Sequence, residues 1–101
     1  MRRPFFSIII PTLNEERYLP HLLADLATQT YQDFEVIVVD AESQDQTPLL
    51  VYDVRKKDKR FLTISCNKRN VSVQRNLGAL ATKGDHLLFF DADTRDRKSV
   101  V

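Results

Sequence analysis

The stretch FEVIVVD at residues 34–40 decides the fold expected for this chain. It is apolar apart from Glu35 and the closing Asp40, and its β-branched residues favour a strand. Apolar character without alternation indicates a strand covered on both faces, as in parallel sheets. Comparable runs lie at residues 5–10 (FFSIII), 61–66 (FLTISC) and 86–90 (HLLFF). Counted along the chain, the first run (residues 5–10), the second (34–40) and the fourth (86–90) are almost continuously apolar. We therefore expect both faces of these three strands to be covered.

The first segment between these runs has helical spacing. Four leucines at positions 19, 22, 23 and 26 form one apolar stripe. Asn14 is placed to cap this helix, but Pro20 would then remove a hydrogen bond from its interior. We therefore expect the helix to begin irregularly or to restart near Leu19.

Two further helices are expected. The second opens with Thr47-Pro48, a cap residue followed by proline at the first helical position, and offers Leu50, Val51 and Val54 to the sheet. The third is capped by Asn70 or Ser72, carries Lys83 in its last turn and is terminated by Gly84. Its expected packed face consists of Val73, Leu77, Leu80 and Ala81. Glycine inside a helix costs about 1 kcal/mol relative to alanine, so Gly78 indicates a close approach to the sheet.

Strands therefore alternate with helices in the order β-α-β-α-β-α-β, which predicts an α/β fold with a Rossmann-like parallel sheet and right-handed crossovers. We expect the strand order 3-2-1-4. The first strand then lies between the second and the fourth, and ligands in such sheets bind beyond the carboxyl ends of the strands, where the strand order reverses.

Length and composition narrow the function. A chain of 101 residues forms one small domain, and its formal charge of +1 gives no field that would favour nucleic acid. The single cysteine, Cys66, excludes an internal disulfide and indicates a reducing compartment. No apolar run approaches the roughly 20 residues that span a bilayer. We expect a cytoplasmic location, with a longer parent protein peripheral to the cytoplasmic membrane face.

Polar side chains follow the predicted strands. Pro11-Thr12-Leu13-Asn14-Glu15 follows the first, Asp40 the second, and Asp91-Ala92-Asp93 the fourth. The strand order would bring Asp40 and Asp91 to either side of the Pro11-Thr12 turn. Carboxylates this close repel each other, so we expect a cation or a donor-rich ligand to offset the repulsion. Oxygen ligands suit Mg²⁺ or Mn²⁺, which implies a phosphorylated substrate. The alternative for Asp-x-Asp alone is a solvated turn.

Four stretches, in this order, carry a family resemblance. They are SIIIPTLNEE at residues 7–16, residues 22–40 with QTY at 29–31, RNLG at 75–78, and FDAD at 90–93. Together they resemble the inverting family 2 glycosyltransferases of GT-A fold. The resemblance covers nearly the whole chain. It implies that residues 1–101 are a single partial domain, the N-terminal half that binds a nucleotide-diphosphate sugar, without the acceptor-binding half.

The resemblance also implies a set of site residues. The nucleotide-sugar-binding positions would be Pro11, Thr12, Asn14, Glu15, Asp40, Arg75, Asp91 and Asp93. Thr12 and Glu15 would line the nucleoside pocket, and Asp40 would contact the base. Asp91 and Asp93 would bind Mn²⁺ or Mg²⁺. The implied reaction is metal-dependent transfer of a sugar from a UDP or GDP donor to an acceptor hydroxyl, on a sugar, a lipid or another molecule, with inversion.

Two departures from the family pattern limit this interpretation. The loop at residues 41–46 lacks the usual glycines, and the catalytic general base is expected beyond residue 101. We therefore expect the isolated chain to be inactive, and a non-catalytic nucleotide-binding module remains an alternative. A sugar-phosphate nucleotidyltransferase is another, although residues 11–15 contain no glycine-rich phosphate loop. The fourth strand is expected to present an open apolar edge and to cause self-association.

Overall fold

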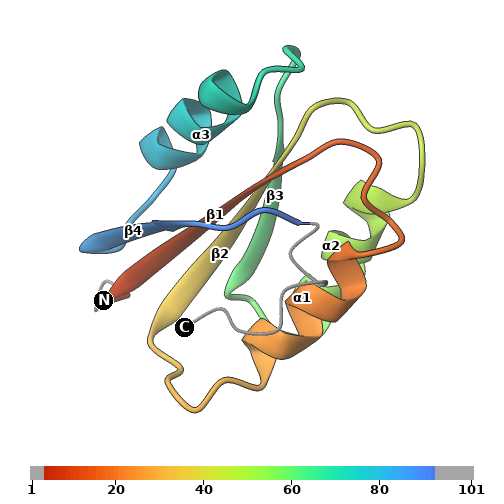
Figure 1. Ribbon diagram of the computed structural model, residues 1–101. Coiled ribbons are helices and arrows are strands. Elements are labelled where there is room, and N and C mark those ends of the chain that lie inside the picture. The colour runs from red at the N-terminus through yellow and green to blue at the C-terminus, as the bar shows by residue number, and fades with distance from the viewer. Residues whose placement is uncertain (1–3, 93–101) are drawn as a thin grey trace.

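The computed structural model describes residues 4–92. Strands and helices alternate along the chain in the predicted order (Figure 1). The elements are β1 (Phe6–Thr12), α1 (Leu19–Ala27), β2 (Phe34–Asp40), α2 (Thr47–Lys57), β3 (Phe61–Ser65), α3 (Val71–Leu80) and β4 (His86–Phe89).

The strands form one parallel sheet in the order β3-β2-β1-β4, which confirms the predicted topology. In the β1–β2 register, Phe6 lies opposite Phe34 at one end and Thr12 lies opposite Asp40 at the other. The strand order reverses at β1. The residues that follow β1, β2 and β4 therefore meet at a single edge of the sheet.

Helices cover the sheet on both faces (Figure 1). On one face, buried leucines of α1 and Val51 of α2 pack on Ile8, Ile10 and neighbouring valines of β2. On the other face, Leu77 and Ala81 from the region of α3 pack on a cluster that includes Ile9 and Val39. Each buried aliphatic side chain of this kind contributes about 1.5 to 3 kcal/mol, so the sheet holds the site on a well-packed support.

The observed start of α1 shows that Pro20 does not lie in the interior of a helix capped by Asn14. The helix begins at Leu19 with Pro20 in its first turn, where a missing N–H costs nothing. A separate turn precedes it, in which the N–H groups of Tyr18 and Leu19 donate to the carbonyl of Glu15. Asn14 does not cap the helix; it adopts a left-handed backbone conformation with a φ of 54°.

The packed face of α3 differs from the expected one. Val73 and Leu80 are exposed, with Leu80 retaining 85% of its accessible surface, whereas Gln74 and Gly78 are buried. A Cβ atom at Gly78 would lie 2.6 Å from Cγ2 of Ile9, so the close approach inferred from the sequence is confirmed. The spacing of apolar residues predicted the wrong face because one buried position, Gln74, is polar and the other, Gly78, has no side chain.

The helix ends also differ in detail from the predictions. Asn70 caps α3, its side-chain oxygen accepting from the N–H of Val73, but α3 ends at Leu80, before Lys83. Gly84 instead donates its N–H to the hydroxyl of Ser7. At α2 the N-cap residue is Gln46, and Thr47 is already helical.

The fourth strand is not covered on both faces within the described residues, which corrects that prediction. All four residues of β4 are exposed, including Leu87, Leu88 and Phe89. The strand lies at the end of the sheet and pairs along one side with β1. Among residues 4–92, β4 is thus a nearly continuous apolar strand at the end of the sheet, and self-association through it stays a prediction.

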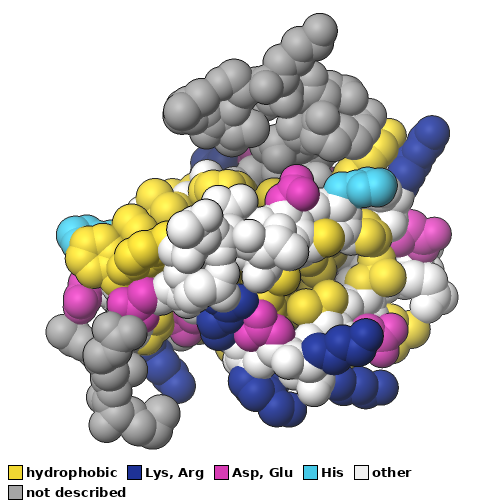
Figure 2. Space-filling view, turned by 90° about the horizontal axis from the view of Figure 1, so that it is seen from below, with side chains coloured by type: hydrophobic (Ala, Val, Ile, Leu, Met, Phe, Trp, Pro, Cys, Tyr) yellow, Lys and Arg dark blue, Asp and Glu magenta, His cyan; other side chains and the backbone are white. Residues whose placement is uncertain are grey.

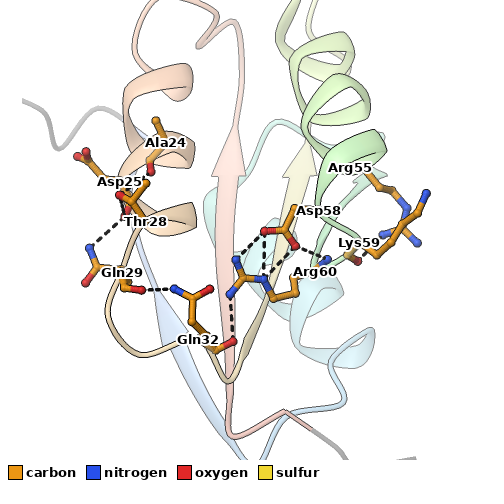
Figure 3. Close-up of polar contacts among 9 residues, drawn as sticks. All are labelled: Ala24, Asp25, Thr28, Gln29, Gln32, Arg55, Asp58, Lys59 and Arg60. Atoms are coloured by element: carbon orange, nitrogen blue, oxygen red, sulfur yellow. Dashed lines mark hydrogen bonds and ion pairs between the residues drawn. The ribbon is translucent and has the colours of Figure 1, made fainter.

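Polar and charged contacts tie the amino ends of the strands to the loops. Arg60 forms an ion pair with Asp58 at 2.6 Å and donates to the carbonyl of Gln32 at 3.0 Å (Figure 3). The guanidinium also lies 4.3 Å from the ring centre of Phe34. On the side of the molecule seen in Figure 2, exposed hydrophobic side chains lie at the left and to the right of the centre, and several lysine and arginine side chains lie along the lower edge. The predicted site residues within residues 4–92 lie at the opposite ends of the strands, at the carboxyl edge of the sheet.

Candidate functional site at the carboxyl edge of the sheet

The centre of the site is the carboxylate of Asp40, which is 3% exposed at the end of β2. Its Oδ1 atom accepts from the hydroxyl of Thr12 at 2.7 Å and from the hydroxyl of Ser43 at 2.5 Å. Its Oδ2 atom accepts from the N–H of Ser43 at 2.8 Å. A buried carboxylate needs such donors, and here they join the end of β1 to the loop after β2.

The loop after β1 is hydrogen-bonded to the loop after β2. Asn14 donates its N–H to the hydroxyl of Ser43 at 2.7 Å, and its side-chain oxygen accepts from the N–H of Gln44 at 2.8 Å. The N–H of Glu15 donates to the hydroxyl of Thr47 at 2.9 Å. The two loops are therefore held as one unit beside Asp40.

Asp45 also holds together the loops that follow β1 and β2. Its carboxylate accepts from the N–H of Glu16 at 3.2 Å, from the N–H of Thr47 at 2.9 Å, and from the Thr47 hydroxyl. Burial raises the pKa of Asp45, but these hydrogen bonds outweigh it and hold the pKa below its usual value. Asp45 thus serves to fix the loops.

The loop at residues 41–46 forms without the glycines of the family pattern. Glu42 adopts a φ of 57°, a left-handed conformation that glycine accepts at little cost. The preceding residue, Ala41, is buried and donates its N–H to the carbonyl of Thr12 at 2.9 Å. The loop therefore keeps a tight turn by placing the strain on Glu42.

Pro11 ends the hydrogen-bonded pairing between β1 and β4. The carbonyl of Ile9 accepts from the N–H of Phe90 at 3.0 Å, so this side of β1 faces β4. Pro11 lies two residues further on the same side and has no N–H with which to continue the ladder. Pairing ends there, and Asp91 follows at the opening.

Arg75 and Asp91 form the part of the site nearest β4. Nη2 of Arg75 lies 3.5 Å from Oδ1 of Asp91, and both side chains are about half exposed, at 41% and 50%. The guanidinium also lies 5.7 Å from the ring centre of Phe89, whereas its buried Nε atom has no hydrogen-bond partner among residues 4–92. This pair has groups available for a ligand.

The structure brings most of the predicted residues together. Thr12, Asn14, Glu15 and Asp40 lie in the linked loops, Pro11 lies beside them in β1, and Arg75 pairs with Asp91. Asp93 lies outside the described residues. Sequence reasoning did not single out Ser43 or Gln74, and it took Thr47 only as a helix cap, yet all three hold these groups in place. No local sequence pattern indicates that Gln74 is buried, because its hydrogen-bond acceptors lie 35 and 62 positions away.

The carboxylates at this edge bear on whether a divalent cation can bind there. Among residues 4–92, no group of three or more His, Cys, Asp and Glu side chains could hold a metal ion. Hard cations such as Mg²⁺, however, often use one or two carboxylates and complete their shell with substrate phosphates and water. The half-exposed carboxylate of Asp91 fits that donor set.

A parallel sheet with polar loops at its switch point is typical of α/β domains that bind ligands at the carboxyl ends of their strands. The family profile described as "Glycosyl transferase family 2" matches residues 7–101. The chain belongs to glycosyltransferase family 2, and its neighbours among solved structures are glycosyltransferases of GT-A fold.

Three comparisons illustrate the likeness. The poly(ribitol-phosphate) beta-N-acetylglucosaminyltransferase TarS of Staphylococcus aureus is 37% identical over 99 residues, covering 95% of this chain and 17% of TarS. The crystal structure of S. aureus TarS 1-349 in complex with UDP-GlcNAc is 35% identical, with a TM-score of 0.76 over 88% of this chain and 26% of that one. The mannosyltransferase PcManGT from Pyrobaculum calidifontis, in complex with GDP-Man and Mn²⁺, has 26% identity and a TM-score of 0.78 over 92% of this chain and 28% of that one.

This chain spans well under half the length of the curated relatives it matches. Within the part of the chain that the structure describes, no helix has both the length and the apolar character needed to cross a bilayer.

Proposed function

We propose that this chain is the donor-binding part of a glycosyltransferase that uses a nucleotide-diphosphate sugar of UDP or GDP type. The observation that carries the proposal is the edge where β1, β2 and β4 end, with the Thr12–Asp40 pair on one side and the Arg75–Asp91 pair on the other. Similar structures hold UDP-GlcNAc and GDP-Man. The sugar would pass to an acceptor hydroxyl, on a sugar, a lipid or another molecule, with inversion.

The two sides of the edge have different proposed roles. Pro11, Thr12, Asn14, Glu15 and Asp40 would shape the nucleoside side. This side is held rigid by hydrogen bonds between its own groups, which favours recognition of a flat, uncharged base and a ribose. Asp40 would act there chiefly by holding Thr12 and Ser43, because its carboxylate accepts hydrogen bonds from both and the residue is only 3% exposed.

The diphosphate would lie on the side of Arg75 and Asp91. Arg75 offers a positive charge, and Asp91 with Asp93 would hold Mn²⁺ or Mg²⁺. A divalent cation bound there would offset the charge that develops on the departing nucleoside diphosphate. The exposed Arg75 guanidinium can meet phosphate oxygens directly, since planar guanidinium groups suit such contacts.

We further propose that residues 1–101 form a single partial domain and that residues outside this range contribute the acceptor site and the general base. The isolated chain would then bind the donor without transferring the sugar. We also propose a cytoplasmic location, in keeping with the free, buried thiol of Cys66. The longer parent would lie at the cytoplasmic membrane face.

Calorimetric titration of the folded chain tests the proposal. UDP and GDP are titrated with and without Mn²⁺ into the wild type and into the Asp91→Asn and Asp93→Asn variants. Asp53→Asn is the matched control, because Asp53 is an exposed carboxylate on α2 that pairs with Lys56. We expect manganese-dependent binding of one nucleotide, weakened at least tenfold by the two site variants and unchanged by the control. Absence of binding to a chain shown to be folded would refute the proposal.

A further inference from the structure

Gln74 is a buried polar side chain that links α3 to two strand ends. It is 3% exposed, and its Nε2 atom donates to the carbonyl of Thr12 at 3.1 Å and to the carbonyl of Val39 at 2.9 Å. Two carbonyl acceptors on the same side require the NH₂ group there, so the contacts themselves determine the orientation of the amide. The side chain therefore spans the carboxyl ends of both β1 and β2.

Packing alone does not require an amide at this position. Burying an amide is unfavourable unless it is hydrogen-bonded, and an apolar side chain of similar volume would fill the same space without that condition. The neighbouring contacts of α3 with the sheet, at Leu77 and Gly78, are apolar. An apolar residue could not donate hydrogen bonds to the two carbonyls. It therefore could not fix the distance between α3 and the carboxyl edge of the sheet.

The position of Gln74 relates the two sides of the site. One acceptor belongs to Thr12, the partner of Asp40, and the other belongs to the residue directly before Asp40. The next residue along α3 is Arg75, which pairs with Asp91. A shift of α3 along or away from the sheet would therefore move Arg75 relative to the Thr12–Asp40 pair.

We propose that Gln74 is a positioning residue that sets the separation between the nucleoside side and the diphosphate side of the donor site. It acts through Thr12 and Arg75 and need not touch the ligand itself. The proposal rests on the proposed function. It predicts that ligands that contact both sides depend on Gln74 more than ligands that contact one side.

The test compares UDP with uridine in a Gln74→Met variant, which keeps the volume and removes the donor. Ser7→Ala is the matched control, because Ser7 is fully buried and hydrogen-bonded at the opposite end of the sheet. We expect Gln74→Met to weaken UDP binding in Mn²⁺ at least tenfold and uridine binding, followed by NMR titration, less than threefold. The Ser7→Ala variant should bind both as the wild type does, even where its thermal stability falls as far.

Equal losses for UDP and uridine, or no loss for UDP, would overturn the proposal for Gln74 while leaving the proposed function standing. A second measurement needs no ligand: the NMR signals of the Ala41 N–H and the Arg75 Nε–H in the same variants. Gln74→Met should shift both signals, and Ser7→Ala should shift neither. If the wild type binds no nucleotide, the proposed function fails, and unchanged signals in Gln74→Met would separately exclude positioning by Gln74.

Discussion

Replacing Gly78 by alanine should destabilise the protein, although alanine is the better helix former. The added Cβ would lie 2.6 Å from Cγ2 of Ile9 and 2.9 Å from Cγ2 of Val39. Both side chains are fully buried and β-branched, so they have little freedom to move aside. Contacts this short place the cost of overpacking at the upper end of its usual range, about 3 kcal/mol, and the gain in helix propensity returns about 1 kcal/mol. We therefore expect a net loss of about 2 kcal/mol.

Urea unfolding followed by circular dichroism measures this loss. For slopes of about 1 to 2 kcal/mol per molar urea, the midpoint should fall by roughly 1 to 2 M. Asn76→Ala is the control, because Asn76 is exposed on the same helix and gains propensity without a clash. Its stability should rise by no more than about 0.7 kcal/mol. A Gly78→Ala variant as stable as the wild type would refute the close-packing argument.

Three other predictions follow from features of the structure. Glu42→Gly should raise the melting temperature by about 4 to 8 °C in calorimetry, because it removes the cost of a left-handed backbone at a φ of 57°, which is about 1 kcal/mol for a residue with a side chain; a lower melting temperature would contradict this. The hydrogen bond from Arg60 holds the pKa of Asp58 below its usual 3.8, so this carboxylate stabilises the fold above that pH and the contribution is lost as the pH falls through the lowered value. Asp58→Asn should therefore remove part of the acid-induced loss of stability seen in urea midpoints below about pH 4, and parallel profiles for the two proteins would argue against the ion pair. Finally, we expect concentration-dependent self-association in sedimentation, reduced by Leu88→Lys on the exposed strand β4 but not by Leu49→Lys on α2, and a wild type that stays monomeric would count against it.

The strand order and the edge of the sheet could be predicted from the sequence because they depend on local patterns. Buried parallel strands are nearly continuously apolar, and β2 shows this from Val36 to Val39. Helices with regular leucine spacing, such as α1, bury the expected residues. The carboxyl edge then follows from topology, which brings Thr12 opposite Asp40.

The parts that were missed depend on partners distant in the chain. Gln74 is buried because carbonyl groups 35 and 62 positions away accept its hydrogen bonds, and no local pattern indicates this. The fourth strand has the composition of a covered strand, and only its place in the sheet exposes it. Sequence patterns report burial preferences, whereas the actual surroundings depend on which elements are adjacent.

The register of the sheet also affects the order in which the protein can assemble. β1 is synthesised first, yet one of its two neighbours is β4, so that Ile8 must wait for Leu88 to emerge. Every strand pair in this sheet joins segments separated by a helix, and none is a local hairpin. Such non-local pairing slows folding. A nascent chain will therefore carry the hydrophobic strand β1 with an unpaired side until β4 has emerged, and its yield in cells should respond to translation rate and chaperone supply.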